Sequence, residues 1–205
     1  MIVVIAIIGI LSIIVLVGHS TFNKTLVLAN TAYDVALLFR SAETYGITSR
    51  FGGANTNASY GLDFNSGTPT QIILFGDTNP SIATKYGAGA TPDKHPGDGY
   101  YTSGSDYLSQ TYTLNNGMKV SNFCALQGAL SYCWSGGTSP NMTRLDVVYA
   151  RPNTFASTTP FASNGLPITA IYFTKACVTL TSPQGGSRSV STNYLGEIQA
   201  TSTCP

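Results

Sequence analysis

The chain begins MIVVIAIIGILSIIV, residues 1–15, a stretch without a charged residue or a proline. The apolar run continues to residue 17 and is interrupted only by Gly9 and Ser12. A run of this length is at the short limit for a membrane span, which needs about 20 apolar residues. We therefore expect the segment to be buried either in lipid or among other copies of the same helix.

An amphipathic pattern follows between residues 26 and 46. Its apolar residues recur at spacings of four and three, which places them in one stripe along a helix. The stripe consists of Leu28, Ala32, Val35, Phe39 and Ala42. No proline occurs before Pro69, so one helix is predicted from near Met1 to about Tyr45, with Gly46 as its stop signal. The stripe is expected to pack against a sheet of the same chain.

Short β-favouring runs appear from Phe51 onward, separated by glycine, asparagine, serine and threonine. They are SYGLDF (59–64), TQIILFG (70–76), QTYTLN (110–115), RLDVVYA (144–150), ITAIYFT (168–174), CVTLTS (177–182), SRSVSTNY (187–194) and LGEIQAT (195–201). The tract PQGG (183–186) is typical of a hairpin turn between two of them. Residues 76–109 are rich in Gly, Pro and Asp and are predicted to form a long surface loop.

These patterns predict an α+β fold, in which a long N-terminal helix packs on a C-terminal antiparallel β-sheet domain. Three parts are expected along the chain. Residues 1–25 form an apolar helix segment for a membrane or a filament core, and residues 26–50 form an amphipathic helix packed on the sheet. Residues 51–205 form a globular β-rich head domain.

The composition favours an extracellular protein. Of the 205 residues only 9% are charged, and the formal net charge is +1, whereas about 25% charged residues is typical. Serine, threonine, asparagine, glycine and tyrosine supply the polar surface instead. The ten basic residues are scattered, so there is no strong signal for nucleic-acid binding.

The four cysteines, Cys124, Cys133, Cys177 and Cys204, all lie in the C-terminal half. The chain has only two histidines, far apart, and no CxxC motif, which argues against a zinc site. An even number of cysteines in a chain with this N-terminus favours two disulfides. We favour Cys124–Cys133 and Cys177–Cys204, while the other connectivities and four buried free thiols stay open as alternatives.

The run VVIAIIGIL (3–11) and the amphipathic helix after it resemble the N-terminus of type IV pilins and type II secretion pseudopilins. The segments AYDVALLFRSAETYGITSR (32–50) and SRSVSTNYLGEIQ (187–199) are also similar to pilin-like subunits. The resemblance implies the pilin fold and a helix that forms the core of a helical polymer. The residues expected in that filament core are Ile5, Ile8, Gly9, Leu11, Ile14 and Leu16. Gly9 also matches the glycine of the family's helix.

The chain departs from the family at its beginning. Mature members start with Phe-Thr-Leu-Ile-Glu before the apolar run, and Met1 falls just after the position of that glutamate. We expect that these residues and the basic leader with its cleavage-site glycine are missing from the recorded start.

No catalytic motif is recognisable, since the sequence contains no GxSxG, Walker loop or HExxH. We therefore expect no enzyme, and we expect no cofactor. Within the segment 93–106, Asp93, Asp98 and Asp106, with His95 nearby, could gather around a calcium ion, as in the loops of some pseudopilins. The alternative is a turn-rich loop in which Asp and Pro serve the backbone geometry. The tyrosines of this region, Tyr100, Tyr101, Tyr107 and Tyr112, are expected either to contact neighbouring subunits or to cap the sheet.

The resemblance implies a structural subunit that self-associates into an extracellular type IV pilus at the cell surface, with the major pilin favoured. Before assembly such a subunit resides in the inner membrane and is handled by a pilus assembly machinery. The alternatives are a minor pilin or pseudopilin that primes assembly or secretion, and, in another class, a surface adhesin or a DNA-uptake receptor.

Overall fold

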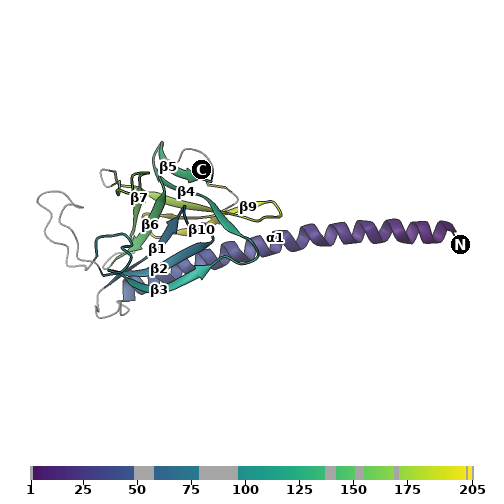
Figure 1. Cartoon of the computed structure of the whole chain (residues 1–205), viewed down its shortest axis with the longest axis horizontal. Coiled ribbons are helices and arrows are strands. Elements are labelled where there is room, and N and C mark those ends of the chain that lie inside the picture. The colour runs from purple at the N-terminus through teal and green to yellow at the C-terminus, as the bar shows by residue number, and fades with distance from the viewer. Residues whose placement is uncertain are drawn as a thin grey trace, which may run out of the picture.

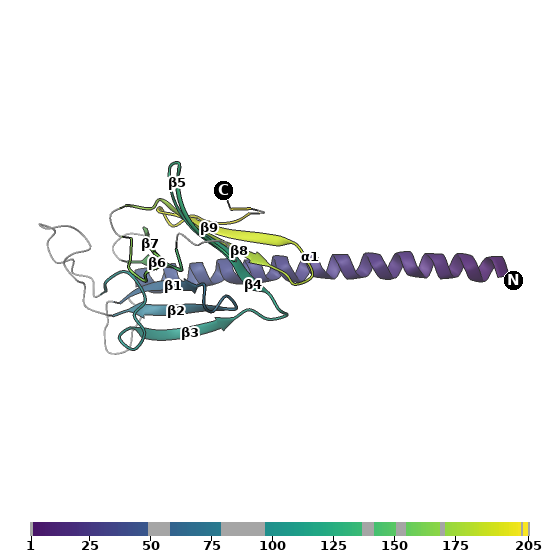
Figure 2. The same cartoon turned by 45° about the horizontal axis from the view of Figure 1, so that its top comes forward.

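The computed structural model describes residues 2–48, 58–78, 97–136, 142–150, 155–168, 171–201 and 203–204, and within the helix it describes the side chains of residues 2–13 and 25–48. The helix α1 (Ile2–Thr48) leads from the N-terminus to a β-rich head (Figure 1). Its C-terminal part lies along the head, whereas its N-terminal part extends away from every strand. Figure 2 shows the same separation after the view is turned.

The described strands form two antiparallel sheets of five strands each. The first sheet has the order β3-β2-β1-β6-β7 and consists of β1 (Ser59–Asn65), β2 (Gln71–Asp77), β3 (Tyr107–Thr113), β6 (Arg144–Tyr149) and β7 (Ala156–Phe161). The second sheet has the order β10-β9-β8-β4-β5 and consists of β4 (Lys119–Gln127), β5 (Leu130–Ser135), β8 (Lys175–Thr181), β9 (Ser187–Asn193) and β10 (Ile198–Thr201). The chain therefore leaves the first sheet after β3, returns to it at β6 and ends in the second.

The C-terminal part of α1 contacts both sheets. It touches β1, β2 and β6 of the first sheet and β8, β9 and β10 of the second. On the side of the first sheet, Phe39 stacks on Phe64 with their ring centroids 5.7 Å apart. On the side of the second sheet, the Leu28 side chain lies 3.4 Å from where a Cβ of Gly186 would stand, in the turn between β8 and β9. The core of the head is thus built around the helix.

The predicted fold class, a long helix packed on one antiparallel sheet as in the pilin fold, is wrong. Beyond α1, the described residues are mostly β, with ten strands in two antiparallel sheets that both contact the helix. The physical reason is that the period of an apolar stripe records which face of a helix is buried but not how many sheets bury it. The pairing of distant strands is likewise set by packing, which local periodicity does not encode.

Several strands also differ from the prediction. The hairpin β4–β5 and the strand β7 were not predicted, and the described part of the predicted strand 168–174 is irregular. There, Phe173 is buried and contacts the Tyr132 ring edge-on, with the centroids 5.6 Å apart. Ile168 and Ile171 also pack against the core, so the apolar residues of the described part contribute to it without forming a strand. The tract 183–186 does form the β8–β9 turn, where the Gly185 N–H donates to the Ser182 carbonyl at 3.0 Å.

Gly46 does not end the helix, because α1 continues to Thr48. The glycine is instead required by close packing against β6. A Cβ at Gly46 would lie 2.3 Å from the Tyr149 carbonyl oxygen, well inside contact distance. Gly46, which we interpreted as a stop signal, therefore marks a position where the backbone of α1 lies close to the backbone of β6.

We predict that Gly46→Ala lowers the free energy of unfolding by about 1–3 kcal/mol, the usual cost of overpacking. This cost outweighs the gain of about 1 kcal/mol that alanine brings to a helix interior. Denaturant titration followed by the fluorescence of Trp134 measures the change. Gly9→Ala is the matched control, since a Cβ there meets nothing within 4 Å. Equal stability of the two variants would contradict the packing role of Gly46.

Candidate functional site

The most unusual surface of the molecule is the beginning of α1, residues 2–13, which we term the apolar segment. All twelve residues are exposed. The large side chains, whose exposed fractions lie between 52% and 85%, are Ile2, Val3, Val4, Ile5, Ile7, Ile8, Ile10, Leu11 and Ile13. Because consecutive positions of a helix point in all directions, apolar surface faces outward on every side. Contiguous exposed apolar surface of this kind marks an interaction site.

The apolar segment contains one polar side chain, that of Ser12, and one glycine, Gly9. The Ser12 hydroxyl donates to the Ile8 carbonyl at 2.8 Å, so its only proton is used within the helix. Gly9 has nothing within 4 Å of the position of its missing Cβ, which leaves a shallow, side-chain-free spot on the helix surface. Small residues at such spots let another helix approach closely.

Within the described part of the chain, no helix combines the length and the hydropathy that crossing a membrane requires.

The residues expected in a filament core fall into two groups. Ile5, Ile8, Gly9 and Leu11 lie in the apolar segment and are exposed in the single chain. The side chains of Ile14 and Leu16 lie outside the described residues. Exposure in the single chain is what a surface for self-association requires.

The residues expected to pack on the sheet are all buried. Leu28 and Ala32 are exposed by 4% and 3%, and Val35, Phe39 and Ala42 are fully buried. One polar contact links the exposed side of this part of α1 to the first sheet, because the Tyr112 hydroxyl of β3 donates to the Asp34 carboxylate at 3.1 Å. Arg40 and Glu43 form an ion pair at 2.7 Å within the helix itself. The head therefore holds the helix firmly at one end and presents the apolar segment at the other.

The four cysteines form two disulfides, each with at least one cysteine in the second sheet. Cys124 is bonded to Cys133 and Cys177 to Cys204, and none of them is free. These are the pairs that we favoured from the sequence, so the alternatives of other pairings and of free thiols are excluded. The first bond ties β4 to β5, and the second ties the C-terminal residues to β8.

The acidic residues that we considered as calcium ligands are only partly brought together. Asp98 and Asp106 lie with Asp77, a residue that sequence reasoning missed, in a group whose carboxylate oxygens are within 4.8 Å of one another. Asp93 and His95 lie outside the described residues. Asp77 ends β2, whereas the other two belong to residues 97–106, which we term the strap. The three aspartates come together only through the fold, and no local sequence motif predicts that they do.

Backbone hydrogen bonds explain the position of these carboxylates. Asp77 accepts the N–H groups of Asp98 at 3.0 Å and of Gly99 at 2.7 Å. Asp106 accepts those of Thr78 at 2.9 Å and of Thr102 at 2.6 Å. The carboxylates thus fasten the strap to the end of β2, as expected for the alternative of a turn-rich loop. We assign no cation to the group.

A buried ion cluster fastens the middle of the strap, and sequence reasoning missed this cluster too. Asp63 of β1 and Asp146 of β6 are register partners, and Arg144 lies beside both. The Arg144 Nε donates to Asp63 at 2.6 Å and to Asp146 at 3.0 Å, and its Nη2 donates to Asp146 and to the Tyr101 carbonyl. The Tyr101 N–H donates to Asp146 at 2.7 Å. The guanidinium also lies 4.3 Å from the centre of the Phe161 ring.

Two tyrosines of the strap cap the outer face of the first sheet. The Tyr101 ring packs on Phe75 of β2 with the centroids 5.2 Å apart, and Tyr100 meets Phe161 of β7 edge-on at 5.3 Å. Tyr100 and Tyr101 thus cap the sheet, one of the two roles considered for these tyrosines, and contacts with neighbouring subunits stay a prediction. Tyr107 is exposed by 40% and stays available at the edge of the sheet.

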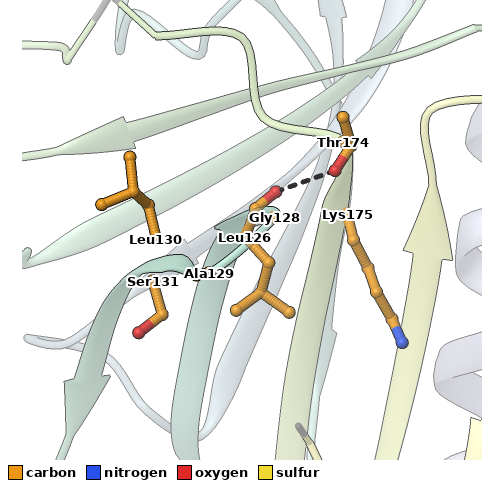
Figure 3. A pocket seen from close by; sticks show the side chains of 7 residues that line it. All are labelled: Leu126, Gly128, Ala129, Leu130, Ser131, Thr174 and Lys175. Carbon is orange, nitrogen blue, oxygen red and sulfur yellow. Dashed lines mark hydrogen bonds between the residues drawn. The ribbon is translucent and has the colours of Figure 1, made fainter.

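A hollow of about 330 Å³ lies at the β4–β5 hairpin (Figure 3). Leu126, Gly128, Ala129, Leu130, Ser131, Thr174 and Lys175 line it. The Thr174 hydroxyl donates to the Leu126 carbonyl at 3.2 Å, and the Lys175 side chain points away from Leu130 and Ser131. The lining offers one amine and no carboxylate or imidazole, so it forms no catalytic constellation.

Comparisons of the chain with protein-family models, with curated proteins and with solved structures found no match.

We predict that the free energy of unfolding falls as the pH rises from about 4 to about 8. Burial, and then the charges of Asp106 and Asp98, raise the pKa of Asp77 from 3.8 to about 8. The folded state therefore binds more protons than the unfolded state in this window, and the slope is negative, by up to about 1.4 kcal/mol per pH unit for one group. Burial also raises the pKa of Asp146, which acts in the same direction.

Denaturation of Asp77→Asn at several pH values checks this prediction, because the variant should show a smaller slope than the parent chain. Leu166→Ala, which changes a head residue exposed by 63% and removes no titratable group, is the control and should keep the parental slope. A parental slope in Asp77→Asn would show that the protonation of Asp77 is not linked to folding.

Proposed function

We propose that this chain is a structural subunit that associates with copies of itself into an extracellular filament, with its helices in the filament core and its β-rich head outside. The observation that carries the proposal is the apolar segment, which is exposed on every side of α1. The resemblance of residues 3–11 to type IV pilins and pseudopilins supports the same assignment.

The all-round exposure argues for several partners rather than one. A helix that meets a single partner needs one apolar stripe, whereas a helix that is apolar on all faces is stable only when it is surrounded. Packing among helices of other copies covers every face, at roughly 25 cal/mol for each Å² of apolar surface removed from water. Gly9, which has no side chain and no neighbour, allows close helix contacts in such a bundle.

The head supports this arrangement because it holds α1 at only one end. The buried stripe from Leu28 to Ala42 fixes the direction of the helix, so that the apolar segment projects as a rod (Figure 1). Copies joined through these rods would carry their heads on the outside of the polymer. Only 9% of the residues of the chain are charged, a composition that suits exposure to the medium.

The proposal rests on the helix and not on the predicted fold class. Lipid would cover the same apolar surface. Removal of detergent in the absence of lipid distinguishes a helix that needs lipid from one that packs among other copies. An inner-membrane assembly machinery, and the membrane as the location before assembly, are partners that only the resemblance implies. The role as major rather than minor subunit likewise stays a prediction from the resemblance.

The direct test starts from the purified chain in detergent. On removal of the detergent without lipid, the chain should form filaments of uniform diameter in negative-stain electron microscopy. Ile8→Asp should abolish them, because a carboxylate in a helix bundle is costly to bury. Ile8→Leu should retain them, and so should Leu166→Asp, which places the same charge at a position on the head that is exposed by 63%. Dispersed monomers or amorphous aggregate from the parent chain, or filaments from Ile8→Asp, would refute the proposal.

The abundance of the chain in sheared surface filaments tests its role in the polymer. We expect it to be the dominant protein when filaments from cells that make it naturally are analysed by quantitative mass spectrometry. Presence only in traces would favour a minor, assembly-priming subunit, and presence only in the membrane fraction would contradict the extracellular assignment.

A further inference from the structure

Three of the four cysteines form a row across the middle of the second sheet. Cys124 of β4 is the register partner of Cys133 on β5, to which it is bonded. On its other side, Cys124 is also the register partner of Cys177 on β8. Residues directly opposite each other in an antiparallel pair point to the same face, with Cβ atoms about 4.5–5.5 Å apart. Cys124 therefore has two cysteine neighbours, only one of which is its disulfide partner.

The fourth cysteine, Cys204, lies on the same face of the sheet. It is bonded to Cys177, and its sulfur accepts the hydroxyl proton of Thr179 at 3.2 Å. Thr179 lies two residues from Cys177, so its side chain points to the same side. Their chain neighbours Ala176 and Val178 belong to the core, on the opposite face. All four sulfur atoms thus gather on the face that points away from the core.

The four cysteines differ in exposure. Cys124 and Cys177, the inner cysteines, are exposed by 1% and 0%. Cys133 and Cys204, the outer cysteines, are both partly exposed. The outer cysteine is thus the more exposed partner of each disulfide, and a thiol from solution is expected to attack there. Attack there expels the inner sulfur as a thiolate, directly beside the other inner cysteine.

We propose that these cysteines form an exchange site for low-molecular-weight thiols, at which the two disulfides rearrange into a Cys124–Cys177 disulfide. The inference is independent of the proposed function, because it depends only on the register of the second sheet. In the first step, a thiolate such as that of glutathione attacks the Cys204 sulfur. A mixed disulfide forms on Cys204, the Cys177–Cys204 bond breaks, and the electron pair leaves on the Cys177 thiolate.

In the second step, the Cys177 thiolate attacks the Cys124 sulfur across the β4–β8 pair. The Cys124–Cys177 bond forms, the Cys124–Cys133 bond breaks, and Cys133 leaves as a thiolate that takes a proton from water. Two disulfides are present before and after, and one external thiol has become one protein thiol. Attack at Cys133 instead leads to the same Cys124–Cys177 bond, with the mixed disulfide on Cys133 and Cys204 as the free thiol.

The rearrangement changes what is tied to the sheet. The new bond links two central strands that are already paired, whereas the C-terminal residues and β5 lose their covalent links. The exchange site would thus free the C-terminal end and β5 from their covalent links together in response to thiols, while the backbone pairing and the core face of the sheet keep their contacts.

Peptide mapping of the folded parent chain tests the proposal. The chain is incubated with reduced glutathione under conditions in which its near-ultraviolet circular dichroism is retained, and free thiols are then alkylated. We expect linked peptides containing Cys124 and Cys177, together with alkylated Cys133 or Cys204. Only native linkages, only fully reduced chains, or Cys133–Cys177 links in similar amount would overturn the proposal, the last because it would show exchange in unfolded chains.

Two double variants provide a test that does not depend on the first cleavage. Cys133→Ser with Cys204→Ser leaves the two inner cysteines, and oxidised glutathione should join them within one chain. Cys124→Ser with Cys204→Ser leaves Cys133 and Cys177, which β4 separates by two strand spacings, roughly 10 Å, so that no bond should form. Equal oxidation of the two folded variants would refute the role of the register.

Discussion

Both sheets of the head complete their inner faces against the same short length of helix, and the remaining architecture depends on this shared packing. Leu28, Val35 and Phe39 are buried where α1 meets strands of each sheet. Because neither sheet has another helix to cover its inner face in the described residues, removal of α1 would expose both. The C-terminal part of α1 therefore forms the core of the head, whereas its apolar segment is exposed.

The outer face of the first sheet is closed by a different kind of interaction. Here the strap supplies backbone N–H groups, and Asp77, Asp106 and Asp146 accept them. Buried carboxylates are costly unless they are hydrogen-bonded or paired, and Arg144 compensates for only part of the charge. The buried carboxylates lower the stability of the fold, but each of them accepts one or two backbone N–H groups and so fixes the conformation of the strap. Apolar packing alone would not specify these backbone positions.

What could be predicted from the sequence follows from the range of the interactions involved. The stripe from Leu28 to Ala42 was recognisable because a helix repeats its buried positions within a few residues. The preferred cysteine pairs were also correct. In contrast, β7 carries Pro160 and little apolar character, and it becomes a strand through its pairing with β6. Asp77 and Asp106 lie 29 positions apart, and Asp63 and Asp146 lie 83 apart, so only the folded sheet brings their carboxylates together. Gly46 was misinterpreted because a close approach to β6 and a helix end both favour glycine.

The alternation of the chain between the two sheets has a consequence for biosynthesis. The helix stripe leaves the ribosome first, yet β9 and β10, which cover it from the second sheet, are translated more than 140 residues later. Contacts between residues so far apart in sequence form slowly, and the head cannot close stepwise from the N-terminus. The side of the stripe that faces the second sheet therefore stays uncovered until β9 and β10 have been translated, whereas β1 and β2 can cover the other side early.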